Sequence, residues 1–269
     1  MSKNFELLRR AGKDEALFGP SPMVSRSNNG ARAQSETEIS RGNKVHPVKG
    51  DTAPRQPGFT GLALEETVKL VQRVFLLPNS HAPRAVVFSS VQGKGSSEIC
   101  LRTGEVLATQ GLGSVCLVDA DINAPSLHQL LGLGNVPGLM DATLKERPIK
   151  DFVAQIAGEN LWAVPLGSGG APAQGLFASD RLRSRMRELR EKFDYVLIDA
   201  PPVGSYAEAV SLGQMADGVI LVVEANSTRR EKAQVAKEAF QSANVKLLGA
   251  ILNSRAFPIP EALYRKLGN

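Results

Sequence analysis

Three aspartates stand directly after runs of apolar residues, where a carboxylate could hold a metal ion. Asp119 and Asp121 follow the run 114–118, and Asp199 follows the run 195–198. Two carboxylates this close repel each other unless a cation or hydrogen-bond donors offset their charge. A lone acid after an apolar strand is also the residue type that holds Mg²⁺ beside a nucleotide phosphate. The pattern therefore predicts a Mg²⁺ site, although aspartates in these positions also cap turns.

A glycine- and serine-rich loop follows an earlier apolar run and reads Ser-Ser-Val-Gln-Gly-Lys-Gly-Ser-Ser over residues 89–97. The phosphate-binding loop template, G-x-x-x-x-G-K-[ST], uses backbone amides to cradle phosphates, a lysine to neutralise them and a hydroxyl to bind Mg²⁺. If Lys94 is placed on the template lysine, Phe88 replaces the first glycine and Gly95 replaces the hydroxyl. That alignment fails at two positions.

A second alignment places Gly95 on the second glycine of the template. Ser97 then supplies the hydroxyl, Ser90 is a small substitute for the first glycine, and only the lysine is lost, to Ser96. We prefer this alignment, which predicts phosphate contacts from the loop and Mg²⁺ ligands in Ser97, Asp119 and Asp199. The residues expected to contact the nucleotide in the loop are Gly93, Gly95, Ser96 and Ser97.

The elements that would position these residues alternate along the chain. Uniformly apolar strands separated by helices are typical of a parallel sheet that is covered on both faces, where ligands bind at the carboxyl ends of the strands. The sequence therefore predicts a doubly wound, mostly parallel α/β domain over residues 61–269. Strands are expected at 85–88, 114–118, 161–164, 195–198, 218–223 and 247–252, with helices at 64–78, 97–109, 181–192 and 228–242.

The composition restricts the class of protein. Of the formal charge of +5, residues 1–60 contribute +4, because they hold ten Lys or Arg and six Asp or Glu. We expect a short helix over residues 1–18 and a disordered linker over 19–60, because the linker is too rich in Pro, Gly, Ser and charge to fold. Basic residues are not interleaved with aromatic ones, which argues against a nucleic-acid partner.

Other features of the sequence point to a soluble, cytoplasmic protein. The two cysteines, Cys100 and Cys116, lie in apolar stretches without metal-ligand spacing, so we expect both to be reduced core residues. No stretch approaches the length of a membrane-spanning helix, and the N-terminus lacks the apolar core of a signal peptide. Any contact with the membrane would then come through a partner or the N-terminal tail.

Several blocks of sequence, in order, resemble the bacterial tyrosine kinases of capsule and exopolysaccharide export, which are related to the MinD/ParA ATPases. Residues 115–125 look like the second Walker motif of that family, and residues 193–203 are similar to its Walker B segment. Asn253 stands where the family has an asparagine that contacts adenine. The resemblance spans residues 64–253 and implies a P-loop fold, ATP and Mg²⁺ as cofactors, and catalytic roles for Asp119 and Asp121.

The chain departs from the family pattern at functionally important positions. The Walker A lysine of the family corresponds to Ser96, and the C-terminal tyrosine cluster is reduced to Tyr264. Lys94, the only basic residue of the loop, either takes over the catalytic role of the lost lysine or is a solvated loop residue. Further departures occur at Arg102, at Asn123, and in the oligomerising motif, which becomes Glu66, Lys69 and Gln72.

Three functions follow from this comparison. The first is an ATP-binding relative of these kinases, with impaired catalysis, that docks on a membrane polysaccharide co-polymerase. The second is a scaffold that no longer binds nucleotide. The third is a MinD/ParA-type positioning ATPase, which is disfavoured because neither Val91 nor Gln92 supplies the extra lysine of those proteins. Because the oligomerising motif is only partly preserved, a homo-oligomer, if one forms, is expected to be weakened.

Overall fold

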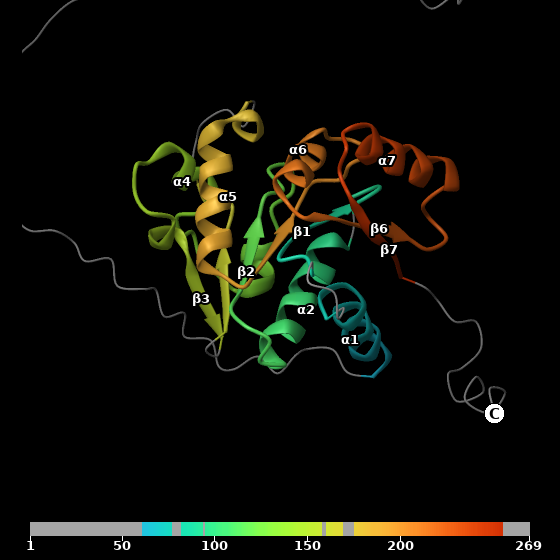
Figure 1. Cartoon of the computed structure of the whole chain (residues 1–269), viewed down its shortest axis with the longest axis horizontal. Coiled ribbons are helices and arrows are strands. Elements are labelled where there is room, and N and C mark those ends of the chain that lie inside the picture. Colours follow the sequence, from blue (N-terminus) through green and yellow to red (C-terminus); the bar gives the residue numbers. More distant parts are fainter. Residues whose placement is uncertain (1–60, 77–81, 94, 158–159, 169–174, 255–269) are drawn as a thin grey trace, which may run out of the picture. The chain divides into compact units, whose positions relative to one another are not determined.

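The computed structural model describes residues 61–76, 82–93, 95–157, 160–168 and 175–254. Their centre is a seven-stranded sheet in the order β3-β4-β2-β5-β1-β6-β7 (Figure 1). The prediction of a doubly wound, mostly parallel sheet is confirmed. The strands are β1 (Ala85–Ser90), β2 (Val115–Asp119), β3 (Ala154–Ala157), β4 (Leu161–Val164), β5 (Tyr195–Asp199), β6 (Gly218–Glu224) and β7 (Leu247–Asn253).

Strands β1 and β2 are buried along their whole length, and β5 is buried except at its first residue, which is why these strands read as apolar runs. Every neighbouring pair in the sheet is parallel except β3 and β4, which run antiparallel. The sequence reading missed β3, because this short edge strand, Ala-Gln-Ile-Ala, has no long apolar run. The sheet therefore has one strand more than predicted.

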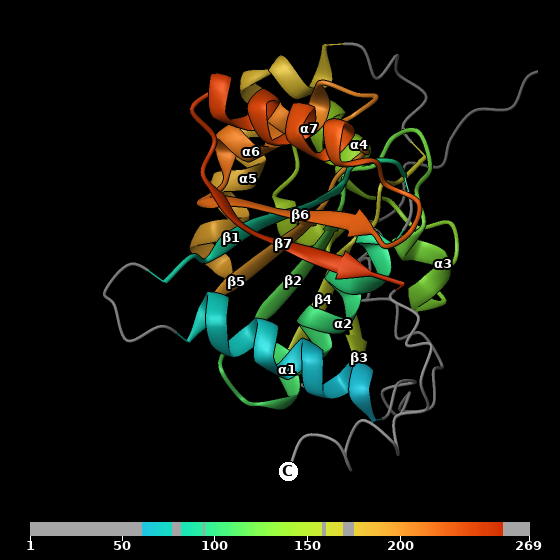
Figure 2. The same ribbon diagram turned by 90° about the vertical axis from the view of Figure 1, so that its right-hand side faces the viewer.

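Helices cover both faces of the sheet, as Figure 2 shows. On one face, α1 and α2 pack with α3 over a core that includes Phe75, Phe88 and Leu107. On the other face, α4, α5, α6 and α7 cover a second core that includes Met186 and Phe240. The helices are α1 (Leu62–Phe75), α2 (Ser96–Thr109), α3 (Leu127–Leu131), α4 (Leu139–Leu144), α5 (Asp180–Lys192), α6 (Glu208–Met215) and α7 (Arg230–Ser242), with short 3₁₀ turns η1 (Ile149–Phe152) and η2 (Leu176–Ala178).

The long helices agree with the predicted ones to within three residues at each end, and the short helices α3, α4 and α6 were not predicted. Local capping fixes some of these ends. The hydroxyl of Ser179 accepts the Leu182 N–H and so begins α5, as an N-cap serine does. Both cysteines are buried and free, as predicted.

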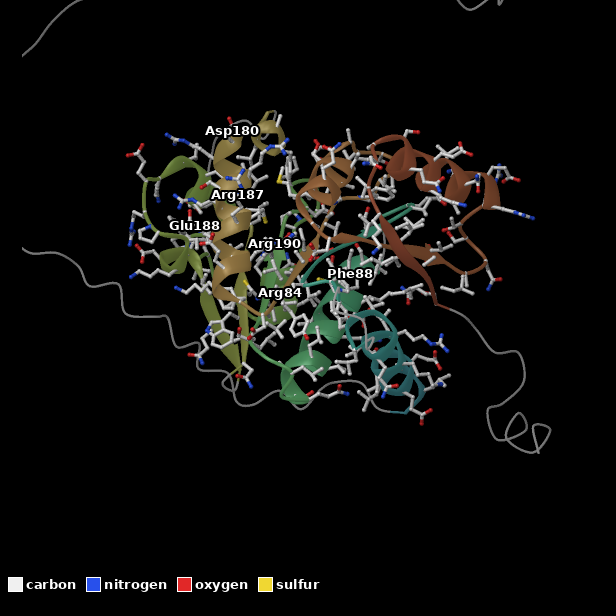
Figure 3. All side chains as sticks on the ribbon, in the orientation of Figure 1. Arg84, Phe88, Asp180, Arg187, Glu188 and Arg190 are labelled. Atoms are coloured by element: carbon white, nitrogen blue, oxygen red, sulfur yellow. The ribbon has the colours of Figure 1, made fainter. Side chains whose placement is uncertain are left out.

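The amino-terminal end of β1 is held by a charged clamp on the side opposite the predicted site. Asp217 accepts the backbone N–H groups of Arg84 and Ala85, both at 2.8 Å, and forms a 2.6 Å ion pair with Arg190 of α5. Figure 3 shows Arg84 and Arg190 near the end of α5 that leads into β5. Burial alone would raise the pKa of Asp217, but these interactions outweigh it and lower that pKa. The clamp fixes β1, β6 and α5 to one another.

Several sequence predictions lie outside the described residues. They are the helix over 1–18, the linker over 19–60, Lys94, and everything after residue 254, including Tyr264. Within the part of the chain that the structure describes, no helix combines the length and apolar character needed to cross a bilayer.

Candidate nucleotide-binding site

The sheet register places the predicted acids at one edge. β2 and β5 are parallel neighbours, and Asp119 lies directly opposite Asp199 at their carboxyl ends. On the other side of β5, Asp199 lies opposite Phe88 of β1, the strand that leads into the glycine-rich loop. The acids and the loop therefore meet at the edge of the sheet where ligands bind in such folds.

Asp199 is the buried acid of this edge that has no partner. Its side chain is fully buried, and neither carboxylate oxygen forms a hydrogen bond with any described residue. Burial, with the nearby charges of Asp119 and Asp121, raises the pKa of Asp199 from 3.8 to about 8, although the hydroxyls of Ser97 and Ser96 lower it in part. A buried carboxyl group without a hydrogen-bond partner is an incomplete site, because burying a polar group unpaired is unfavourable whether or not it is charged.

The other two acids are already engaged with the backbone. Asp119 accepts the N–H of Leu127, at the start of α3, at 3.1 Å and the N–H of Asp121 at 3.3 Å. Its burial raises its pKa to about 7, although these hydrogen bonds lower it in part. Asp121 in turn accepts the N–H groups of Asn123 and Ala124 at 3.0 and 3.1 Å. The turn-capping role that the sequence left open is thus present in the structure.

This arrangement differs from a metal site built of three carboxylates. Among the described residues, no group of three or more His, Cys, Asp or Glu has a geometry that could hold a metal ion. Asp199 with the Ser97 hydroxyl nevertheless fits Mg²⁺ bound between protein and phosphate, because its two oxygens are buried and unpaired. Mg²⁺ usually takes one or two protein carboxylates and completes its shell with water and phosphate oxygens.

The loop between β1 and α2 has the backbone of a phosphate cradle. Gly93 and Gly95 both have φ of 90°, a left-handed conformation that side chains other than glycine rarely adopt. The side chain of Asn253, at the end of β7, lies so close to Gly95 that an added Cβ there would overlap its Nδ2 atom. Asn253 is therefore at the loop, where a residue that contacts a bound nucleotide would lie.

In the alignment that we prefer, the position of the template lysine is the first residue of α2. Ser96 occupies it and is 6% exposed. Further along the helix, Arg102 forms an ion pair with Glu98. A bound triphosphate would meet the amides of the loop, the N-terminus of α2 and the Ser97 hydroxyl, but no lysine from position 96.

Two buried serine hydroxyls fix the loop before any ligand binds, and the sequence predicted a hydrogen-bonding role for neither of them. Ser89 donates to the carbonyl of Pro201 at 2.8 Å and accepts the N–H of Val203 at 3.1 Å, which joins β1 to the segment after Asp199. Ser90 accepts the N–H of Gly93 at 2.8 Å. The only signal in the sequence was a pair of polar residues at the end of an apolar strand.

A cavity of about 360 Å³ borders the segment that Asp119 and Asp121 cap. Its lining includes Pro125, His128 and Val136, which follow that segment, and Pro165 and Leu166, which follow β4.

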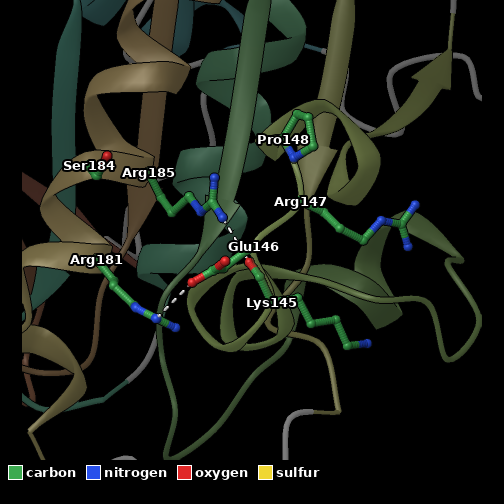
Figure 4. A pocket seen from close by; sticks show the side chains of 7 residues that line it. All are labelled: Lys145, Glu146, Arg147, Pro148, Arg181, Ser184 and Arg185. Atoms are coloured by element: carbon green, nitrogen blue, oxygen red, sulfur yellow. Dashed lines mark hydrogen bonds and ion pairs between the residues drawn. The ribbon is translucent and has the colours of Figure 1, made fainter.

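A second cavity, of about 380 Å³, lies between α5 and residues 145–148 (Figure 4). Arg181 faces Glu146 in an ion pair of 3.5 Å, and Arg185 donates to the carbonyls of Ala142 and Lys145, both at 2.8 Å. The side chain of Lys145 points away from α5. The polar groups of this cavity therefore hold α4 and α5 together.

The combination of a doubly wound sheet, a glycine-rich loop before a helix and an acid at the end of a neighbouring strand is that of the P-loop NTPase fold. Residues 82–266 match the family described as "ParA: NUBPL iron-transfer P-loop NTPase". Because this match covers more than half of the chain, the protein belongs to that family of P-loop NTPases.

Within this family, the chain is similar to bacterial tyrosine kinases. The chain is 32% identical over 170 residues to the tyrosine-protein kinase YwqD of Bacillus subtilis. The aligned region covers 63% of this chain and 71% of the relative. It is 28% identical over 163 residues to the tyrosine-protein kinase CpsD of Streptococcus agalactiae, covering 60% and 70%. The resemblance to bacterial tyrosine kinases is confirmed.

Solved structures agree on the fold. The chimerical protein CapA2B2 has a TM-score of 0.67 at 24% identity, covering 72% of this chain and 85% of that one. The kinase domain of the Escherichia coli tyrosine kinase ETK has a TM-score of 0.67 at 19% identity, covering 73% and 78%. At these identities the likeness establishes the shared fold.

Proposed function

We propose that this protein binds Mg²⁺ and a nucleoside triphosphate, ATP by family resemblance, weakly at the P-loop edge and transfers phosphate poorly or not at all. The observation that carries this proposal is the buried Ser96 at the lysine position, within an otherwise well-formed loop. Phosphoryl transfer depends on positioning and on neutralising the charge of the phosphates. Losing one such electrostatic contact costs about 3–4 kcal/mol of transition-state stabilisation in other enzymes.

We further propose that the protein acts in the cytoplasm as a regulator of polysaccharide polymerisation or export. Its partner would be a membrane co-polymerase that recruits it to the inner face of the membrane. The support is the family resemblance to bacterial tyrosine kinases, together with 32% identity to one of them over most of the folded domain. With catalysis impaired, the protein would regulate its partner by binding to it and by changing conformation when it binds nucleotide.

A scaffold that no longer binds nucleotide is the second candidate. Two observations favour it: the Gly93 amide of the loop already has a partner in Ser90, and Asn253 lies against Gly95. Both reduce the space and the hydrogen-bond donors that a phosphate would use.

A titration of the purified full chain with ATP and Mg²⁺ separates the two candidates. We expect weak binding by the native protein and tighter binding by Ser96→Lys, about tenfold for each 1.4 kcal/mol recovered. Gln110→Lys is the matched control, because it adds the same charge at the other end of α2. If neither the native chain nor Ser96→Lys binds ATP, the nucleotide-binding proposal is wrong and the scaffold is favoured.

A further inference from the structure

Ser90 occupies the position of the first glycine in the phosphate-binding template, and its side chain forms a hydrogen bond within the loop. The residue is 2% exposed, and its hydroxyl oxygen accepts the backbone N–H of Gly93 at 2.8 Å. Gly93 lies inside the loop, between the two positions that the template reserves for glycine. A glycine at position 90 could not make this hydrogen bond.

The amide of Gly93 belongs to the set of donors that gives such loops their affinity. Phosphate-binding loops hold anions through successive backbone N–H groups that point into the loop. In this protein the amides should carry a larger share of the affinity, because position 96 supplies no lysine. An N–H that already donates to a buried hydroxyl has to exchange that hydrogen bond before it can bind a phosphate oxygen.

We propose that Ser90 is an affinity-determining residue whose hydroxyl occupies the Gly93 amide in the free protein and competes with the phosphate of an incoming nucleotide. This inference rests on the proposed nucleotide binding and deepens it. The site would then accept a triphosphate only when its other contacts, including Mg²⁺ at Asp199 and Ser97, outweigh the lost internal hydrogen bond. A net hydrogen bond of typical strength corresponds to a change of about two- to tenfold in affinity.

The neighbouring Ser89 provides a matched control. It is the same residue type in the same strand, and it is also fully buried. Its hydroxyl, however, bonds the backbone of Pro201 and Val203, not an amide of the loop. Removing it should reduce stability without freeing a donor for phosphate.

The experiment measures Mg²⁺–ATP affinity by calorimetry on the full chain and four variants. Ser90→Ala should bind about two- to tenfold more tightly than the native protein, the change that one net hydrogen bond makes. Ser90→Thr keeps the hydroxyl and should bind like the native chain, and Ser89→Ala should show no gain. In the free protein, the Gly93 amide should exchange with solvent faster in Ser90→Ala, as followed by NMR.

The fourth variant, Ser96→Lys, separates this inference from the proposed function. If Ser96→Lys binds ATP but Ser90→Ala binds no more tightly than the native chain, the inference about Ser90 is overturned and nucleotide binding stands. A gain in Ser89→Ala equal to that in Ser90→Ala would also overturn it, because any loosening of the loop would then suffice. If no variant binds ATP, both proposals fall.

Discussion

Replacing Asp199 with asparagine should change how the stability of this protein depends on pH. The carboxyl group is fully buried without a hydrogen-bond partner among the described residues, and burial raises its pKa from 3.8 to about 8. At 1.36 kcal/mol per pKa unit, a shift of about four units corresponds to at most about 6 kcal/mol. Relaxation of the protein and entry of water reduce this value. We therefore expect the free energy of unfolding of the native protein to fall by about 2–4 kcal/mol, relative to the variant, between pH 5 and pH 8.

The direction of the effect follows from where the proton resides. Because the folded pKa lies above the unfolded one, the folded chain keeps a proton that the unfolded chain has lost between about pH 4 and pH 8. The stability of the native protein therefore falls as the pH rises through this range. The amide introduced by Asp199→Asn does not titrate, so the stability of the variant does not fall in this way. Because the amide is also buried and unpaired, it lowers the free energy of unfolding by about 1–3 kcal/mol at every pH. The free energy of unfolding of the variant, relative to that of the native chain, should therefore rise steadily from pH 5 to pH 8.

Urea unfolding at pH 5, 6, 7 and 8, without nucleotide or Mg²⁺, measures this difference. Asp194→Asn is the control, because Asp194 is exposed and its hydrogen bonds from Ser114 lower its pKa. The stabilising contribution of Asp194 is complete above the unfolded pKa, so its loss should cost the same across the whole range. If the curves for the native protein and Asp199→Asn run parallel from pH 5 to pH 8, Asp199 is not a buried, unpaired acid.

Two further changes test the loop. Gly95→Ala should lower the melting temperature, because its φ of 90° is unfavourable for alanine and its Cβ would overlap Asn253. Adding Asn253→Ala should recover part of the loss, and no recovery would mean that the contact with Asn253 is unimportant. Lys94→Ala should weaken Mg²⁺–ATP binding by about tenfold, because Lys94 is the only basic residue of the loop. Unchanged affinity, measured by the same titration, would mean that Lys94 is a solvated residue.

The sequence alone was sufficient for the parallel sheet, its long helices and the residues that gather at its carboxyl edge. Buried parallel strands are apolar throughout, so β1, β2 and β5 could be read directly from the chain. The β3 strand could not, because an antiparallel edge strand of four residues has neither a long apolar run nor a clear alternation. The short helices α3 and α4 were missed for a similar reason, since five or six residues show no helical period.

Only the tertiary structure decided what each polar side chain of the site does. The sequence predicted Mg²⁺ ligands in Asp119 and Asp199 and catalytic roles for Asp119 and Asp121. It could not show that Asp119 and Asp121 accept nearby backbone N–H groups, whereas Asp199 has no hydrogen-bond partner among the described residues. It treated Ser90 as a small replacement for glycine, whereas folding turns its hydroxyl onto the Gly93 amide. Residue type and spacing fix which groups reach the edge of a sheet. Which donor meets which acceptor depends on loop conformation and register, and these are set by contacts between segments far apart in the chain.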